Sequence, residues 1–386
     1  MSEKNCHIYK AICKLVKDGH VPEPASLVGV LGDTYEADII SLVADIHTSV
    51  GWEYHAEQMV EAATRRNLLE LADMIRGGIE SRSTSSEIMS DIKKRVTKLS
   101  DTGGKATESI VDLLPGVVES LEKGSVRPGV GSGFYDIDRI TGGWQNGELI
   151  IIAGRPGMGK SLLAKDFAEA AKVPTLIFSL EMSKAELIKR QLSGASRVDF
   201  ESIRTSNVAD SDWDSISRAA NKLSDLPIYY NDSGRLTIDQ LCAIAETKKL
   251  TKGIGLVIID YLQLIRSVEK ADQREREVAN LSRELKTLAR TLDIPVICLA
   301  QLNRECEKRV PPRPRLFDLR ESGAIEQDAD IVGFLFRPWV YNRDADQHEA
   351  HFIIAKSRNT RTGTIKLVFD GSIQRFDSAV RGNDYE

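Results

Sequence analysis

The chain has 386 residues, a net charge of −5 at pH 7 and 41% hydrophobic residues. This length favours two domains over one. No run approaches the roughly 18 apolar residues of a membrane span, and Met1–Lys17 lacks the apolar core of a signal peptide. We therefore expect a cytoplasmic protein without a membrane partner. The acidic charge argues against a surface coated in nucleic acid, although it allows a local basic track.

The five cysteines have no paired CxxC spacing, which fits a reducing compartment. Cys6 and Cys13 could form a metal pair with His7, but small buried residues on a helix explain them more simply. The cysteines therefore predict neither disulfides nor a metal centre.

The first quarter of the chain has a different pattern of apolar residues from the rest. Residues 1–98 show helical periodicity and predict a small all-helical domain. A linker rich in polar residues, Gly and Pro follows over 99–130. Within it, 108–123 is an amphipathic segment that we expect to be interrupted at Pro115–Gly116.

Residues 131–386 predict an α/β domain with a mainly parallel sheet, because buried apolar runs alternate with helical patterns. The longest of these helical patterns is Arg274–Leu292. Shorter strands after residue 350 predict hairpins at one sheet edge. The expected strands are Leu149–Ala153, Thr175–Phe178, Leu256–Ile259, Val296–Leu299, Ile331–Phe336, Phe352–Ala355, Thr364–Phe369 and Ile373–Phe376.

A phosphate-binding loop follows the first of these strands and precedes the expected helix 161–171. Its glycines turn backbone N–H groups toward phosphates, and the helix N-terminus adds positive potential. Lys160 would reach the β- and γ-phosphates of ATP, and Ser161 would give an oxygen to Mg²⁺. A glycine-rich turn with a chance Lys-Ser pair does not explain the strand–loop–helix context. The predicted nucleotide contacts are Gly154, Arg155, Pro156, Gly157, Met158, Gly159, Lys160, Ser161 and Leu162.

Three further polar residues end predicted strands, which places them at the same sheet edge as the loop. Asp260 is the candidate metal-side carboxylate, with a strand-end cap as the alternative. Glu181 is the candidate base that orients the attacking water, unless it caps the helix beginning near Ser183. Gln301 is a candidate γ-phosphate sensor, because an amide can bind a phosphate oxygen or a water. Together these features indicate a RecA-like P-loop ATPase core.

Six motifs in a fixed order resemble the bacterial and phage replicative DNA helicases of the DnaB type. The resemblance is dense over 130–377 and thinner over 1–80, where the family's helical collar domain would lie. The motifs are GRPGMGKS at 154–161, SLEMS at 179–183, IIDYLQL at 258–264, AQLNR at 300–304, DLRESGAIEQDAD at 318–330 and KSRNTRTG at 356–363.

The resemblance implies roles that residue type alone does not indicate. Lys356 and Arg358 match residues that the family inserts into the ATP site of the next subunit. Arg320, Glu321 and Gly323 match the central-channel loop that holds the backbone of single-stranded DNA. From charge alone, Lys356, Arg358 and Arg320 would be solvated surface residues.

The family further implies a ring-forming, hexameric helicase with 5′→3′ polarity that uses ATP and Mg²⁺ and works with primase and a helicase loader. Segment 108–123 resembles the linker helix that docks on a neighbouring subunit, and the collar is expected to be shortened. The 304–320 stretch has six basic and three acidic residues but is not rich in aromatics. We therefore expect DNA contacts to the backbone rather than stacked bases.

Two alternatives compete with the helicase interpretation. A RecA-fold recombinase or clock-type ATPase would share the P-loop and a similarly placed glutamate, but not the DLRESGAIEQDAD block or the helical N-terminal region. A loading scaffold that uses ATP only as a conformational clamp would not need Glu181 or Arg358.

Overall fold

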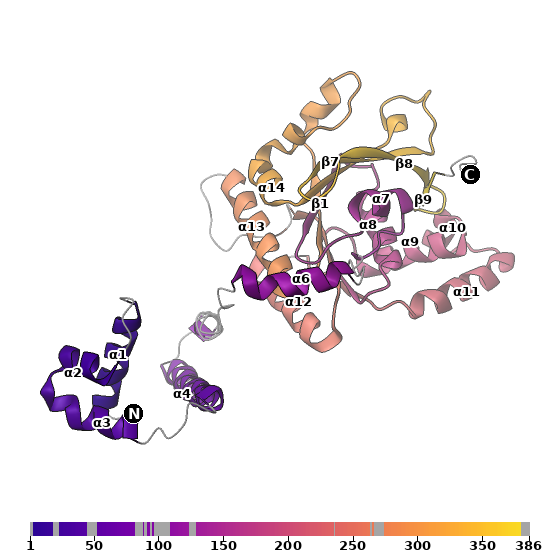
Figure 1. Cartoon of the computed structure of the whole chain (residues 1–386). Helices are drawn as coiled ribbons and strands as arrows, with labels where there is room; N and C mark the ends of the chain where they lie inside the picture. Colours follow the sequence, from indigo (N-terminus) through magenta and orange to yellow (C-terminus); the bar gives the residue numbers. More distant parts are fainter. Residues whose placement is uncertain are drawn as a thin grey trace. The chain divides into compact units, whose positions relative to one another are not determined.

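The computed structural model describes residues 3–17, 23–44, 52–81, 88, 91–92, 95, 109–122, 129–234, 236–262, 265 and 274–379. The chain forms two compact units, Met1–Lys123 and Gly124–Glu386 (Figure 1). The boundary between them, after Lys123, falls within the linker predicted at 99–130. Residues 99–108 and 123–128 of that linker lie outside the described residues.

The first unit contains only helices among its described residues, as the sequence predicts. A small apolar core formed by Ile8, Ala11, Leu15, Leu27 and Ile39 joins its first helices. The elements are α1 (Glu3–Lys17), α2 (Pro24–Leu31), the 3₁₀ helix η1 (Asp33–Tyr35), α3 (Glu36–Ala44), α4 (Trp52–Glu80) and α6 (Ile110–Glu122).

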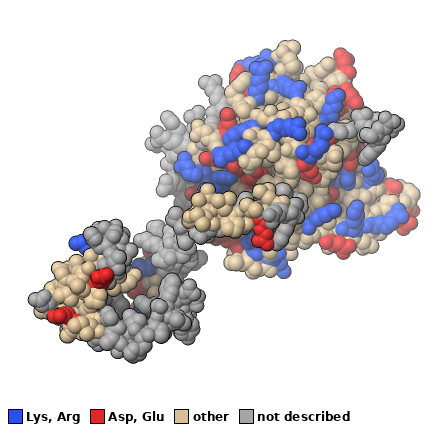
Figure 2. All heavy atoms as spheres, in the orientation of Figure 1, with Lys and Arg blue, Asp and Glu red and all other residues tan. Residues whose placement is uncertain are grey.

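Helix α6 corrects one sequence prediction, because it runs through Pro115 without interruption. Proline has no N–H, so it removes one i→i−4 bond but leaves the other bonds of the helix in place. The described side chains of α6 include several exposed apolar residues, and Figure 2 shows the helix as a largely uncharged surface. These residues are Ile110, Val111, Leu114, Val118 and Leu121.

The second unit is built on a nine-stranded sheet with the order β3-β2-β4-β5-β1-β6-β7-β8-β9. The pairs from β3 to β6 are parallel, and those from β6 to β9 are antiparallel. The mainly parallel sheet and the hairpins at one edge are thus confirmed. The strands are β1 (Leu149–Gly154), β2 (Thr175–Ser179), β3 (Ile228–Asn231), β4 (Leu256–Asp260), β5 (Val296–Gln301), β6 (Ile331–Phe336), β7 (Glu349–Ser357), β8 (Gly363–Asp370) and β9 (Arg375–Ser378).

Helices cover both faces of this sheet (Figure 1). Alternate residues of the central strands point to opposite faces, so Ile150 and Ile152 pack with α7 and α8, while Leu149 and Ile151 pack with α12 and α13. The helices are α7 (Tyr135–Thr141), α8 (Lys160–Ala170), α9 (Lys184–Ser196), α10 (Phe200–Arg204), η2 (Asp210–Asp212), α11 (Trp213–Ser224), α12 (Ile238–Lys252), α13 (Arg274–Leu292), η4 (Arg304–Lys308), η5 (Leu316–Ser322), α14 (Gly323–Asp328) and η6 (Pro338–Val340).

The sequence prediction missed β3 and gave a poor position for the last strand. β3 has four half-buried residues at the sheet edge, so it lacks the fully apolar run that marks the central strands. The last strand begins at Arg375 rather than Ile373, because residues 371–374 form the turn that leads into β9.

Candidate nucleotide-binding site

The phosphate-binding loop lies between the end of β1 and the start of α8. Gly157 and Gly159 have φ angles of 79° and 93°, a region that side chains other than glycine rarely adopt. A Cβ on Gly159 would lie 2.9 Å from Cζ of Phe376. The backbone turn therefore requires glycine at both positions. At Gly159, the close packing of Phe376 on β9 requires it as well.

Lys160 is the first residue of α8, and its side chain folds back over the loop. Its Nζ donates hydrogen bonds to the carbonyls of Gly154 at 2.9 Å and Arg155 at 3.3 Å. Burial lowers the pKa of Lys160, an effect that the nearby carboxylates of Asp260 and Glu181 oppose. The lysine thus lies at the centre of the site, between the loop backbone and two acidic groups.

The carboxylates come from two adjacent parallel strands. Ser179, the last residue of β2, pairs with Asp260, the last residue of β4, and the Leu180 amide donates to the Asp260 carbonyl at 2.8 Å. Asp260 is only 5% exposed. Burial raises the pKa of Asp260, while a hydrogen bond with Ser161 opposes this rise. Strand register therefore brings Asp260 beside the first turn of α8. Glu181 lies in the turn that follows β2.

The alternative role for Glu181, as a helix cap, is wrong. Helix α9 is capped by Ser183, whose side chain accepts a hydrogen bond from the Glu186 amide. Glu181 itself is exposed and lines the cavity beside the loop.

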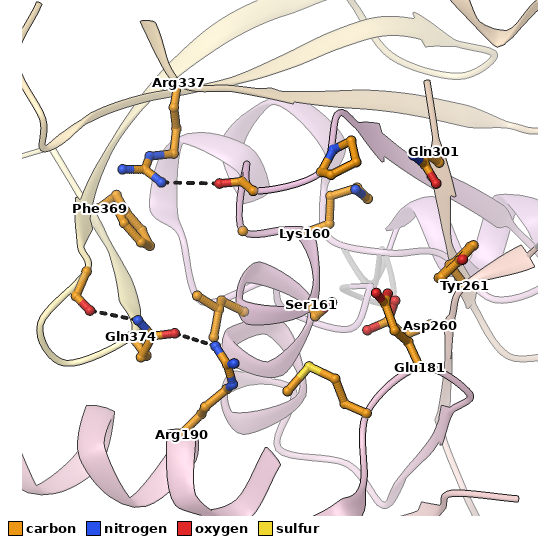
Figure 3. Close-up of a pocket in the computed structure, with 16 residues that line it drawn as sticks. Lys160, Ser161, Glu181, Arg190, Asp260, Tyr261, Gln301, Arg337, Phe369 and Gln374 are labelled. Carbon is orange, nitrogen blue, oxygen red and sulfur yellow. Dashed lines mark hydrogen bonds between the residues drawn. The ribbon is translucent and has the colours of Figure 1, made fainter. Parts of the chain in front are cut away.

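A cavity of about 450 Å³ opens at this edge of the sheet. Figure 3 shows Asp260 and Glu181 close together beside Ser161, with Gln301 on the same side. Ser161, Asp260, Glu181 and Gln301 thus line a single cavity. The predicted residues that line the cavity are Pro156, Gly157, Gly159, Lys160, Ser161, Leu162, Glu181, Asp260 and Gln301.

Three positions of the motif lie outside the cavity lining. Met158 is buried in the core behind the loop. Gly154 ends β1, where a Cβ would lie 3.0 Å from the Leu335 carbonyl oxygen. Arg155 turns away from the cavity and donates to the Leu302 carbonyl and to Glu307.

The opposite side of the cavity contains residues that sequence reasoning missed. The guanidinium of Arg337 lies 3.7 Å from the centroid of the Phe369 ring and donates to the Gly157 carbonyl at 3.4 Å (Figure 3). Burial lowers the pKa of Arg337. Arg190 donates to Gln374 on the same side of the cavity. Arg337 follows β6, Phe369 lies in β8, Gln374 lies in the turn before β9 and Arg190 lies on α9. No local motif marks them.

Lys356 and Arg358 do not line the cavity of their own chain. Lys356 donates to the carbonyls of Glu326 and Ala329, and Arg358 donates to the carbonyl of Gln327. Both side chains therefore cover the C-terminal end of α14. Arg358 is 47% exposed in its side chain.

The residues predicted to hold DNA lie at the junction of η5 and α14. Arg320 and Glu321 fall in η5, and Gly323 begins α14. Their side chains lie outside the described part of the structure.

Known proteins resemble this chain over almost its whole length. Residues 129–378 match the family model of the DnaB-like helicase C-terminal domain. The replicative DNA helicase DnaB of Leifsonia xyli subsp. xyli (strain CTCB07) is 36% identical over 96% of this chain and 85% of that protein. The chain belongs to the DnaB-like replicative helicase family. The replicative DNA helicase DnaC of Bacillus subtilis (strain 168) is 35% identical over 98% of this chain and 87% of that protein.

Solved structures lead to the same family. One of them, an ATPase domain, aligns with a TM-score of 0.67 at 36% identity and covers 70% of this chain and 99% of that chain. A DnaB-like replicative helicase studied with its interactions with primase aligns with a TM-score of 0.69 at 29% identity, covering 98% of this chain and 93% of that chain.

Family membership makes this chain an ATP-dependent replicative DNA helicase with a RecA-like C-terminal domain. It decides against the recombinase and the non-hydrolytic scaffold. In the part of the chain that the structure describes, no helix is long and apolar enough to cross a membrane.

Proposed function

We propose that this helicase forms a hexameric ring that moves along single-stranded DNA with 5′→3′ polarity and unwinds the duplex ahead of it. The observation that carries the proposal is the cavity in which Lys160, Ser161, Asp260 and Glu181 meet at the C-terminal edge of parallel strands. Such an edge is where open α/β sheets bind ligands.

ATP would lie along this cavity with its phosphates on the loop. The loop backbone and the N-terminus of α8 receive the phosphates, and Lys160 exchanges its loop carbonyls for phosphate oxygens. The base would lie toward Arg337 and Phe369, a cation and an aromatic ring suited to a flat heterocycle. This orientation leaves the terminal phosphate beside Glu181 and Gln301.

The donor set near the terminal phosphate fits Mg²⁺. The hydroxyl of Ser161 and the buried carboxylate of Asp260 are hard oxygen donors, which magnesium prefers along with phosphates and water. When bound, the ion would neutralise negative charge on the phosphates. Glu181 is exposed and free to accept a proton from the attacking water, and Gln301 would contact the same water or a γ-phosphate oxygen.

Lys356 and Arg358 would act in the cavity of the next subunit. Their proposed role is supported by their position outside their own cavity and by the exposed side chain of Arg358. Positive charge supplied in trans would stabilise the negative charge that builds up on the γ-phosphate.

Single-stranded DNA would contact the ring through Arg320, Glu321 and Gly323. Basic and acidic side chains are interspersed on the face drawn in Figure 2, so broad attraction to DNA over that face is not expected.

The apolar residues exposed on α6 suit a linker helix that docks on a neighbouring subunit. We further propose that residues 1–98 act as a collar, and that primase and a helicase loader are partners.

The proposed helicase activity is tested by measuring ATP binding, ATP turnover and unwinding of forked DNA by the variant Glu181→Gln. We expect ATP binding close to wild type and a fall in turnover of about 10²–10⁴-fold, because only the base is lost. Unwinding should be lost in parallel, and wild-type protein should need a free 5′ tail to displace the strand. Wild-type turnover by Glu181→Gln would refute the assignment of the base.

A further inference from the structure

Arg155 is a P-loop residue whose side chain leaves the nucleotide cavity. Its Nε donates to Oε1 of Glu307 at 2.7 Å, and one terminal nitrogen donates to the carbonyl of Leu302 at 2.8 Å. The Arg155 side chain is only 11% exposed. A charge-assisted pair with one member largely removed from water is held more firmly than a surface ion pair.

Glu307 belongs to a basic segment, defined here as residues 304–322 and formed by η4, η5 and the loop between them. Two contacts at Asp318 brace this segment. Arg309 forms a two-bonded ion pair with the buried Asp318, and the Asn303 amide donates to the Asp318 carbonyl at 3.1 Å. Glu307 therefore connects the P-loop to a braced segment that ends at Arg320 and Glu321.

The P-loop end of this connection also contacts Lys160. In the structure, Nζ of Lys160 donates to the carbonyl of Arg155 itself at 3.3 Å. An ammonium group has three donors and two are used here, so binding both the β- and γ-phosphates requires Lys160 to release at least one loop carbonyl, and the bond to Arg155 is the longer one. Phosphate binding thus changes the contacts of the same residue whose guanidinium holds Glu307.

We propose that Glu307 is a positioning residue that links the P-loop, through Arg155, to the segment that holds single-stranded DNA. The inference rests on the proposed function, because it takes the end of the 304–322 segment as the DNA contact. A loosened 304–322 segment would still bind DNA, but its affinity would no longer follow the state of the nucleotide.

The experiment measures the dissociation constant of a labelled oligothymidylate for the full-length protein, with a non-hydrolysable ATP analogue and with ADP. For wild type we expect a difference of about 5–150-fold between the two nucleotides, the usual range of coupling between sites. For Glu307→Gln the ratio should fall to near one, with ATPase in the absence of DNA unchanged. By reciprocity, oligothymidylate should lose its effect on the ratio of analogue affinity to ADP affinity by the same factor.

Glu305→Gln is the matched control, because Glu305 lies in the same 3₁₀ helix. Its carboxylate pairs with Lys308 at 2.6 Å, and both side chains are more than half exposed. This variant removes the same charge from η4 and should keep the wild-type ratio. A purely electrostatic effect of the lost charge on DNA would change both variants alike and would overturn the inference.

The remaining outcomes separate the inference from the proposed function. A wild-type ratio in Glu307→Gln, or loss of its DNA-independent ATPase, would overturn the positioning role and leave the DNA contact standing. Wild-type protein that does not bind oligothymidylate would overturn the proposed DNA contact, and the inference with it.

Discussion

Asp166 and Phe376 are 210 residues apart in the sequence and joined by a hydrogen bond of 2.9 Å from the Phe376 amide to Oδ2 of Asp166. Asp166 lies on α8, the helix that begins with Lys160, and Phe376 lies on β9 at the antiparallel edge. The Phe376 ring also packs on Gly159. The hairpin strands therefore hold the phosphate-binding loop and its helix in place.

Phe376→Ala should destabilise the second unit and weaken ATP binding. The ring is 2% exposed, and removal of such a buried aromatic side chain typically costs about 3–5 kcal/mol. Denaturant unfolding and nucleotide titration would measure the two effects. Val368→Ala, which trims a partly exposed residue of β8, should cost far less and leave ATP affinity unchanged. Full ATP affinity in Phe376→Ala would contradict the supporting role of the ring.

Asp166 should make stability depend on pH. Burial raises the pKa of Asp166 from its ordinary 3.8 to about 6, and Lys165 opposes this shift. The folded state therefore binds a proton more readily than the unfolded state. The resulting penalty is fully present above pH 6 and disappears as pH falls toward 3.8. It amounts to about 3 kcal/mol at most.

Asp166→Asn removes this titration while its side-chain oxygen can still accept from the Phe376 amide. Its free energy of unfolding should change less between pH 4 and pH 6 than that of wild type. Unfolding curves across this range would measure the difference. Identical pH profiles for the two proteins would show that Asp166 does not titrate in this window.

The trans role of Arg358 predicts complementation between inactive subunits. Arg358→Ala should lower ATPase by about 10³–10⁵-fold, the range seen when arginine fingers are lost. Lys160→Ala should weaken nucleotide binding in its own subunit. Mixed rings should recover part of the activity, since one interface then combines an intact loop with an intact Arg358. If verified mixed rings showed no ATPase, Arg358 would have only a structural role, through its contacts with Gln327 and Asp330 of its own chain.

Arg320 predicts a change in the salt dependence of DNA binding. For single strands, log K falls with log salt by roughly 0.7 per neutralised phosphate. Arg320→Ala should therefore give a shallower slope and lower DNA-stimulated ATPase, with little change in basal ATPase. Binding should vary little with base sequence. Tight binding that ignores salt and prefers one sequence would contradict a backbone grip.

The sequence alone determined the central strands and the loop that follows β1. These features are local: an apolar run long enough to be buried on both faces, and glycines where the backbone turns back at the phosphates. Asp260 and Glu181 could be predicted as well, because residues that end parallel strands meet at the same edge. The role of Glu181 as base stays a prediction. The same holds for the trans roles of Lys356 and Arg358 and for the DNA contact of Arg320.

Only the tertiary structure decided which distant side chains complete the cavity. Arg337, Phe369 and Gln374 reach it because β6 to β9 fold back beside α8, and no local spacing encodes that return. It also decided that Arg155 leaves the cavity for Glu307, 152 residues away. Such contacts depend on register and packing between elements, which a single sequence leaves open until the chain has folded.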